Sequence, residues 1–203
     1  MDEWVEKIAK NVQAITQRIT TAAVTSGRDP QEIQLVVVTK GQPVDVVEAA
    51  WTAKSARMTS FISAQNRHNV LECRISPQLA AACARHGLGF LPFYPLAAGL
   101  LTGKYRPGEP PAPGTRLSVP NRFYDGILNE ANFARLAKLE DFARERGRSI
   151  LELAIGWLAS QPIVSSVICG ATRPEQVEAN VRASGWRLSA DEMKSIDALV
   201  DLR

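Results

Sequence analysis

The segment from Cys169 to Asn180 has the residue types of a phosphate-binding turn. Its text, CGATRPEQVEAN, follows a β-branched run and leads into a predicted helix, whose N-terminus favours an anion electrostatically. Arg173 is a charged, multidentate donor at that helix start. Gln176 and Asn180 are four residues apart and therefore share a helix face. The candidate residues are Gly170, Ala171, Thr172, Arg173, Gln176 and Asn180.

A second glycine-containing turn lies in the text PFYPLAAGLLTGKY. Gly99 allows a close approach of the backbone to a ligand, and main-chain N–H groups of such a turn can meet phosphate oxygens. Lys104 adds a positive charge, although a solvated lysine suits this position equally well. Outside a binding site, the same text would be only a turn into an apolar helix. Beside Gly99, the family resemblance described below makes candidates of Pro95, Leu96, Leu100 and Lys104.

Composition limits the class of protein. The chain has 203 residues, of which 45% are apolar and 22% charged, so we expect one α/β domain over residues 1–203. The net charge of +3 is spread along the chain, which indicates neither a nucleic-acid partner nor a membrane anchor. Cys73, Cys83 and Cys169 lack the spacing of a disulfide framework or a metal site. With no signal peptide or apolar span, a cytoplasmic location is expected.

Strand-like and helix-like patterns alternate along the chain. Ser76 with Pro77 predicts a helix start, Gly87 a helix end, and the pairs Thr172/Glu175 and Ser189/Glu192 have capping-box spacing. The predicted strands cover residues 35–38, 61–65, 90–93 and 165–169; the predicted helices cover 5–22, 44–56, 76–87, 132–146 and 149–160, with two more closing the chain and a Gly- and Pro-rich loop at 103–120.

This order predicts a parallel sheet of four βα units, which is half of an eight-stranded barrel of the TIM type. Ligands of such barrels bind where the strands end, so the two turns described above are in the expected place. A half barrel has two unpaired edges. Two copies could therefore complete the barrel as a homodimer.

Residues from about 49 to the C-terminus resemble the last third of the aldo/keto reductase barrel, in the texts FISAQN, PFYPLAAGLLTGKY and SSVICGATRPEQVEAN. The resemblance implies an oxidoreductase that binds NADP(H) and acts on a carbonyl substrate. It gives Gln65 the role of bonding the nicotinamide carboxamide and places Phe93 where a tyrosine stacks on the nicotinamide ring. Tyr94 replaces a small polar residue. The turn at Gly99 would wrap the pyrophosphate, and the turn at Arg173 would hold the adenosine 2′-phosphate and the adenine. As alternatives, Gln65 could belong to a strand-end turn and the aromatic residues to the core.

The catalytic motifs of that family, which supply an Asp, a Tyr, a Lys and a His, have no counterpart in this sequence. His68 and His86 are the only histidines, and surface or structural roles are expected for both. We therefore assign no catalytic residue and expect cofactor binding without competent reductase chemistry.

Residues 1–50 resemble a different family, the pyridoxal-phosphate homeostasis proteins, in the text SGRDPQEIQLVVVTKGQPVDVVEAA. That resemblance places Lys40 where a lysine forms a Schiff base with the cofactor. The pattern departs at about residues 49–51, before the phosphate-binding motifs, so a solvated lysine is the alternative. Taken together, the two resemblances suggest a hybrid chain. Three hypotheses follow: an NADP(H)-binding half barrel, a folded chimera without activity, or a pyridoxal-phosphate-binding protein that uses Lys40.

Overall fold

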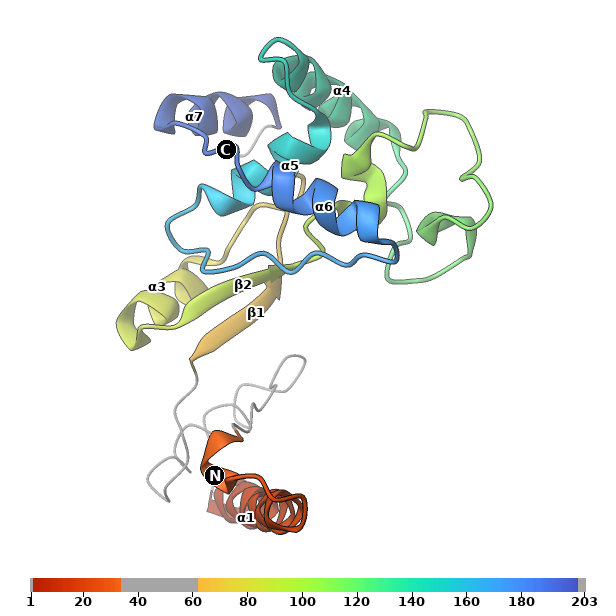
Figure 1. Cartoon of the computed structure of the whole chain (residues 1–203). Coiled ribbons are helices and arrows are strands. Elements are labelled where there is room, and N and C mark those ends of the chain that lie inside the picture. The colour runs from red at the N-terminus through yellow and green to blue at the C-terminus, as the bar shows by residue number, and fades with distance from the viewer. Residues whose placement is uncertain (1, 34–61, 201–203) are drawn as a thin grey trace. The chain divides into compact units, whose positions relative to one another are not determined.

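The computed structural model describes residues 2–33 and 62–200, and the chain divides into two compact units, 1–62 and 63–203 (Figure 1). In the first unit, helix α1 (Asp2–Thr25) precedes a short 3-10 turn, η1 (Pro30–Glu32). Gly27 follows the helix with a φ of +71°, and Arg28 N donates to Ala23 O. Within the helix predicted at 5–22, the apolar residues Val5, Ile8, Val12 and Ile19 are half-buried, and Ile15 and Ala22 are exposed.

The predicted strand at 35–38, the predicted helix at 44–56 and Lys40 lie outside the described residues. One of the four predicted βα units is therefore not seen. The four-unit barrel, the single domain over the whole chain and the completion by a second copy stay predictions.

Strands β1 (Ser63–Arg67) and β2 (Gly89–Phe93) form a parallel pair in which Gln65 lies opposite Leu91 and Arg67 opposite Phe93. The predicted strand boundaries at 61–65 shift by two residues. Residues 163–168 run parallel along the other edge of β2, where Ser165 N donates to Phe90 O and Ile168 N donates to Pro92 O. This third segment makes isolated bridges and no regular ladder. Because Pro92 has no N–H to donate toward it, the ladder is interrupted there.

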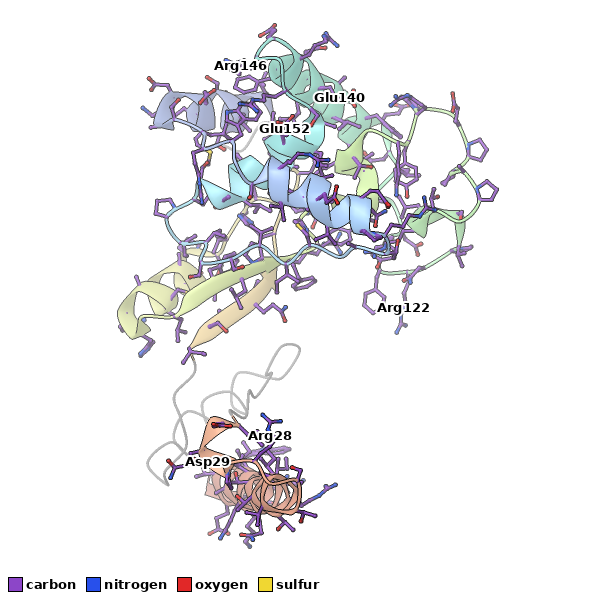
Figure 2. All side chains as sticks on the ribbon, in the orientation of Figure 1. Arg28, Asp29, Arg122, Glu140, Arg146 and Glu152 are labelled. Atoms are coloured by element: carbon purple, nitrogen blue, oxygen red, sulfur yellow. The ribbon has the colours of Figure 1, made fainter. Side chains whose placement is uncertain are left out.

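Helix α3 (Pro77–His86) connects the two strands and begins and ends as predicted. Ser76 Oγ accepts a hydrogen bond from Leu79 N at 3.1 Å, and Gly87 ends the helix with a φ of +61°. Helices α4 (Glu130–Arg144) and α5 (Ile150–Ala159) follow the Gly- and Pro-rich loop, which contains one short 3-10 turn, η4 (Arg116–Ser118). Helix α5 starts with a capping box between Ser149 and Glu152, which is labelled in Figure 2.

The last two helices are α6 (Pro174–Ala183) and α7 (Ala190–Leu199). The capping box predicted at Ser189 and Glu192 is confirmed. The one predicted at Thr172 and Glu175 is wrong, because Pro174 takes the first helical position and makes Arg173 the N-cap. Thr172 N donates instead to Gln176 Oε1 at 2.7 Å.

The core of the second unit is built around α5. Its Leu153, Trp157 and Leu158 are at most 3% exposed and belong to the same cluster as residues from α4, α7 and the turn after β2. A Cβ placed on Gly156 would lie 2.6 Å from the Trp186 carbonyl oxygen, so α5 and the connection before α7 approach closely. Helices α4 to α7 gather on one side of β1 and β2 (Figure 1). Among the described residues, no helix has the length and apolar character to cross a bilayer.

Candidate functional site

Gln65 and Phe93 lie on the same face of the sheet. Side chains alternate along a strand, and Gln65 is in register with Leu91, two residues before Phe93. Both side chains are half-buried, whereas Phe90 and Pro92, on the opposite face, are fully buried. The two residues predicted to contact the nicotinamide therefore lie on the less covered face, near the ends of neighbouring strands.

The turn after β2, which we call the strand-end loop (residues 94–104), has an unusual backbone. Tyr94, Ala97, Ala98 and Gly99 have φ values of +67°, +46°, +57° and +97°. Left-handed conformations cost non-glycine residues free energy and persist only where the surroundings impose them. Here Ala97 and Ala98 are buried, within the 3-10 segment η3 (Ala97–Thr102). The sequence pointed to Gly99 alone and missed the strain of its neighbours.

Internal hydrogen bonds hold the strand-end loop. Gly99 N donates to Leu96 O at 2.8 Å, and Thr102 Oγ1 donates to Gly99 O at 2.7 Å. Pro95 and Leu100 are buried, and Leu96 is half-buried, so these three predicted residues shape the loop more than they offer side chains to a ligand. Lys104 is exposed and folds over Gly99, because a Cβ at Gly99 would lie 2.7 Å from Lys104 Cε.

The other predicted turn, which we call the last turn (residues 169–173), is open. Gly170, Ala171, Thr172 and Arg173 are exposed, and Arg173 is the N-cap of α6 without a side-chain capping bond. Gln176 Oε1 accepts from both Thr172 N and Thr172 Oγ1, at 2.7 and 3.2 Å. The Gln176 side chain thus supports the turn in the ligand-free chain.

Arg116 lies beside the last turn, and sequence reasoning did not point to it. It belongs to η4, and a Cβ placed on Gly170 would lie 3.8 Å from its Nη2. A guanidinium from the long loop therefore stands beside the last turn, where a phosphate group would need a counter-charge. A lone arginine in a Gly- and Pro-rich loop gives little signal in the sequence, because its place depends on how the loop folds back.

Asn180 lies in an open groove beside the last turn, with a volume of about 400 Å³. Ala171 and Cys169 from the turn and Val177 and Val181 from α6 also line this groove. Val177 and Val181 are 51% and 66% exposed, so the groove offers an apolar wall next to an amide.

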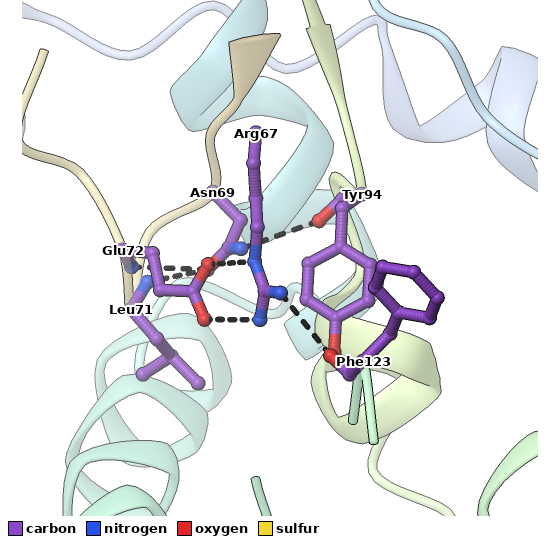
Figure 3. A network of polar contacts seen from close by, with 6 residues as sticks. All are labelled: Arg67, Asn69, Leu71, Glu72, Tyr94 and Phe123. Carbon is purple, nitrogen blue, oxygen red and sulfur yellow. Dashed lines mark hydrogen bonds and ion pairs between the residues drawn. The ribbon is translucent and has the colours of Figure 1, made fainter. Parts of the chain in front are cut away.

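Residues near the ends of β1 and β2 and in the loop before α4 form a network that we call the Arg67 cluster. Its members are Arg67, Asn69, Glu72, Tyr94, Phe123 and Tyr124. Figure 3 shows all of them except Tyr124. The Arg67 guanidinium pairs with the Glu72 carboxylate and lies 4.0 Å from the centre of the Tyr94 ring. The hydrogen bond to Glu72 raises the pKa of Arg67. Burial raises the pKa of Tyr94 to about 12, and the buried Tyr94 hydroxyl makes no hydrogen bond.

The two histidines are accounted for differently. His68 is 1% exposed, packs against Phe90 and Trp157, and has its Nε2 3.2 Å from Gln161 Oε1. Burial lowers the pKa of His68. Its packing among core residues fits the structural alternative in the expectation of a surface or structural role. His86 is exposed at the C-terminal end of α3. Neither stands in either of the two turns.

The structure thus brings the predicted residues together in two places. Gln65, Phe93 and the strand-end loop meet at the ends of β1 and β2, and the last turn follows the neighbouring segment 163–168. Arg116 lies near Gly170, and its charge also acts on the Tyr94 hydroxyl. Together these groups present glycine backbone, a helix N-terminus and guanidinium charge, which suit an elongated anionic ligand.

Known proteins are similar to parts of this sequence. L-glyceraldehyde 3-phosphate reductase of Escherichia coli (strain K12) is 39% identical over 117 residues, which are 55% of this chain and 33% of that protein. A probable voltage-gated potassium channel subunit beta of Arabidopsis thaliana is 33% identical over 143 residues, 68% of this chain and 43% of the relative. Protein tas of Escherichia coli (strain K12) is 28% identical over 170 residues, 83% of this chain and 48% of the relative. The chain spans about a third to a half of the length of these relatives.

The model of the Aldo/keto reductase family matches residues 32–201. This match begins inside the segment that we likened to the pyridoxal-phosphate homeostasis proteins. The comparisons give no support to that likeness, to a hybrid chain or to pyridoxal phosphate as a cofactor. With most of its length inside the family match, the chain belongs to the aldo/keto reductase family.

Proposed function

We propose that this chain binds NADP(H) across the ends of β1, β2 and segment 163–168, as the nucleotide-binding part of an oxidoreductase that acts on carbonyl compounds. The observation that carries the proposal is the juxtaposition of a strained glycine loop, an uncapped helix N-terminus and Arg116 at one edge of a parallel sheet. Helix N-termini and successive backbone N–H groups are common binding places for phosphate.

Each part of the dinucleotide has a candidate partner in this arrangement. Gln65 would bond the carboxamide and Phe93 would stack on the nicotinamide ring, on the face that the helices leave less covered. The strand-end loop would meet the pyrophosphate, with Lys104 moving from Gly99 onto it. Arg173 and Arg116 would hold the 2′-phosphate side, and Asn180 would bond the adenine along the apolar groove. When bound, the cofactor supplies the hydride.

We do not propose carbonyl reduction by this chain alone. The family's Asp, Tyr, Lys and His motifs have no counterpart in the sequence, and a reductase needs a proton donor near the carbonyl. His68, with its lowered pKa, is enclosed by Phe90 and Trp157 and cannot take that role. The named activities of the relatives therefore carry over only as a class: a carbonyl substrate, with catalytic groups supplied from outside the present sequence.

The test is a fluorescence titration of the chain with NADPH and with NADH. Arg173→Ala should weaken NADPH binding about tenfold, since a charge-assisted hydrogen bond contributes about 1.5–3 kcal/mol and this site is exposed. NADH binding should change little, because NADH lacks the 2′-phosphate. Arg182→Ala is the matched control. Arg182 also belongs to α6, but it lies near the C-terminal end of that helix and pairs with Glu178. Failure of the unaltered chain to bind NADPH would contradict the proposal.

A further inference from the structure

We propose that Arg67 is a positioning residue that fastens the loop of residues 105–128 (the 105–128 loop) to the ends of β1 and β2. By holding this loop near the last turn, Arg67 would slow the release of a bound nucleotide, and this second part alone rests on the proposed function.

Arg67 joins three separate parts of the chain (Figure 3). Its Nε and Nη2 pair with the two carboxylate oxygens of Glu72, five residues along the chain. Its Nη1 donates to the Phe123 carbonyl oxygen at 3.2 Å, across 56 positions of sequence. The flat face of the guanidinium lies over the Tyr94 ring at 4.0 Å, a distance at which a cation and an aromatic ring attract.

The 105–128 loop presents matching groups. Tyr124 stacks on Tyr94 with the ring centres 5.7 Å apart and the planes within 5°. A tight turn fixes the Phe123 carbonyl, because Asn121 Oδ1 accepts from Phe123 N and Asn121 O accepts from Tyr124 N. The Phe123 side chain is 69% exposed, so the main chain makes this contact and the ring does not.

The same loop is attached a second time, nearer its start. Tyr105 Oη donates to Ala98 O in the strand-end loop and accepts from Leu117 N, both at 3.4 Å. Arg116, next to this second attachment, is the residue that lies beside Gly170. Residues 116–124 therefore run from the last turn to the end of β1. If the Arg67 attachment is lost, the Tyr105 hydroxyl would still hold this stretch at Leu117.

The Glu72 side is also fixed, which keeps Arg67 in place. Asn69 is fully buried, its Oδ1 accepts from Leu71 N and Glu72 N, and its Nδ2 donates to Tyr94 O at 3.2 Å. The turn after β1 therefore holds the carboxylate rigidly against the guanidinium. A simpler alternative is that the Arg67–Glu72 pair only stabilises the turn after β1. In that case the 105–128 loop would not depend on Arg67.

Hydrogen exchange of the ligand-free chain separates the two readings. In Arg67→Met, the amides of Tyr124 and Ile127 should exchange about tenfold faster, since a charged hydrogen bond and a cation–π contact are lost together. The amides of α5 should be unchanged. Unchanged exchange in the loop would overturn the proposal, and so would an equal rise in α5, which would mark a global loss of stability.

Two further variants keep the test decisive. Tyr124→Leu removes the stack from the loop side and leaves the Arg67–Glu72 pair intact, so it should open the same amides even if Arg67→Met fails to fold. Arg122→Met is the matched control, because Arg122 is an exposed arginine of the same loop that projects outward (Figure 2). Loop exchange in Arg122→Met should equal that of the unaltered chain. If it rises as in Arg67→Met, the role assigned to Arg67 is wrong.

The nucleotide part has its own readout. Stopped-flow displacement of NADPH should give a dissociation rate about tenfold higher in Arg67→Met. The association rate should be unchanged, because the loop would act on the bound nucleotide and not on the free nucleotide that approaches the site. A loop that opens in exchange while the dissociation rate stays constant would overturn the retention role. Absence of NADPH binding in the unaltered chain would contradict the proposed function and leave the exchange experiment to decide the attachment by Arg67.

Discussion

The strand-end loop and the last turn were predicted from the same kind of evidence, yet they are built differently. The first has buried alanines in left-handed conformations, internal hydrogen bonds and a tie through Tyr105. The second is exposed throughout residues 170–173 and follows a segment that makes only isolated bridges. Its support comes from the Gln176 amide and from the neighbouring Arg116.

This difference suggests a division of work within one site. A loop whose strained backbone is fixed before binding pays little conformational entropy when a ligand arrives, whereas an open turn must be ordered by the ligand. We therefore expect the strand-end loop to tolerate backbone changes poorly and the last turn to tolerate them well. The last turn should respond more to the ligand.

The largest expected effect distinguishes the two glycines. Gly99→Ala should lower the free energy of unfolding by about 1–2 kcal/mol, because alanine is strained at a φ of +97°, whereas the exposed end of Lys104 can move away from the new Cβ. Gly170→Ala should change it by less than about 0.5 kcal/mol, since the nearest atom is Arg116 Nη2 at 3.8 Å. Urea denaturation followed by tryptophan fluorescence measures both. Equal effects would remove the distinction between the two regions.

Arg116→Ala tests whether the last turn borrows its charge from the long loop. NADPH should bind about tenfold more weakly, an effect of about 1.4 kcal/mol, with little change in the free energy of unfolding. Arg106→Ala provides a comparison, because Arg106 is in the same loop and donates to Gly103 O and Tyr105 O. If Arg116→Ala leaves the NADPH affinity unchanged, Arg116 does not contact the nucleotide, and Arg173 would be the remaining arginine proposed for the 2′-phosphate.

How much of this could be read from the sequence depends on whether the signal is local. Ser76, Gly87, Ser149 and Ser189 mark helix ends through their own chemistry, and all four predictions hold. The Thr172 capping box failed because Pro174 moved the helix start by one residue.

Non-local contacts were beyond such reasoning. Arg116, Arg67 and the left-handed Ala97 and Ala98 owe their roles to parts of the chain far away in sequence. Residue spacing contains no trace of a 56-residue return from Phe123 to Arg67. The family resemblance supplied the place of the two turns, and the structure supplied what holds them.

The pH dependence of stability should come in part from His68, which packs against Phe90 of β2. Burial favours the neutral imidazole and lowers its pKa, so the unfolded chain takes up the proton first as the pH falls. The free energy of unfolding should be constant at pH values above the pKa of the histidine in the unfolded chain. Below that pKa it should fall, at most by about 1.4 kcal/mol per pH unit. His68→Phe should flatten this dependence. Urea melts at a series of pH values would decide, and a slope that survives in His68→Phe would contradict the assignment.

Tyr94→Phe should have the smallest effect. The hydroxyl is buried without a hydrogen-bond partner, so its removal should change the free energy of unfolding by no more than about 0.5 kcal/mol near neutral pH. Because burial raises the pKa of Tyr94 to about 12, its neutral form is favoured in the fold, and stability is lost as the pH rises past the unfolded value. Tyrosinate absorbance against pH should lose its last step in this variant. A marked destabilisation at neutral pH would mean that the hydroxyl has a partner in solution.

Amide chemical shifts of the labelled chain during a titration with NADP⁺, and separately with NAD⁺, test the central claim most directly. One dinucleotide that bridges the two regions should shift amides of both residues 96–104 and residues 170–176 with a single saturation curve. The difference between NADP⁺ and NAD⁺ should be confined to residues 170–176 and Arg116. Shifts in only one region, separate saturation curves, or no saturable shift at all would contradict the account.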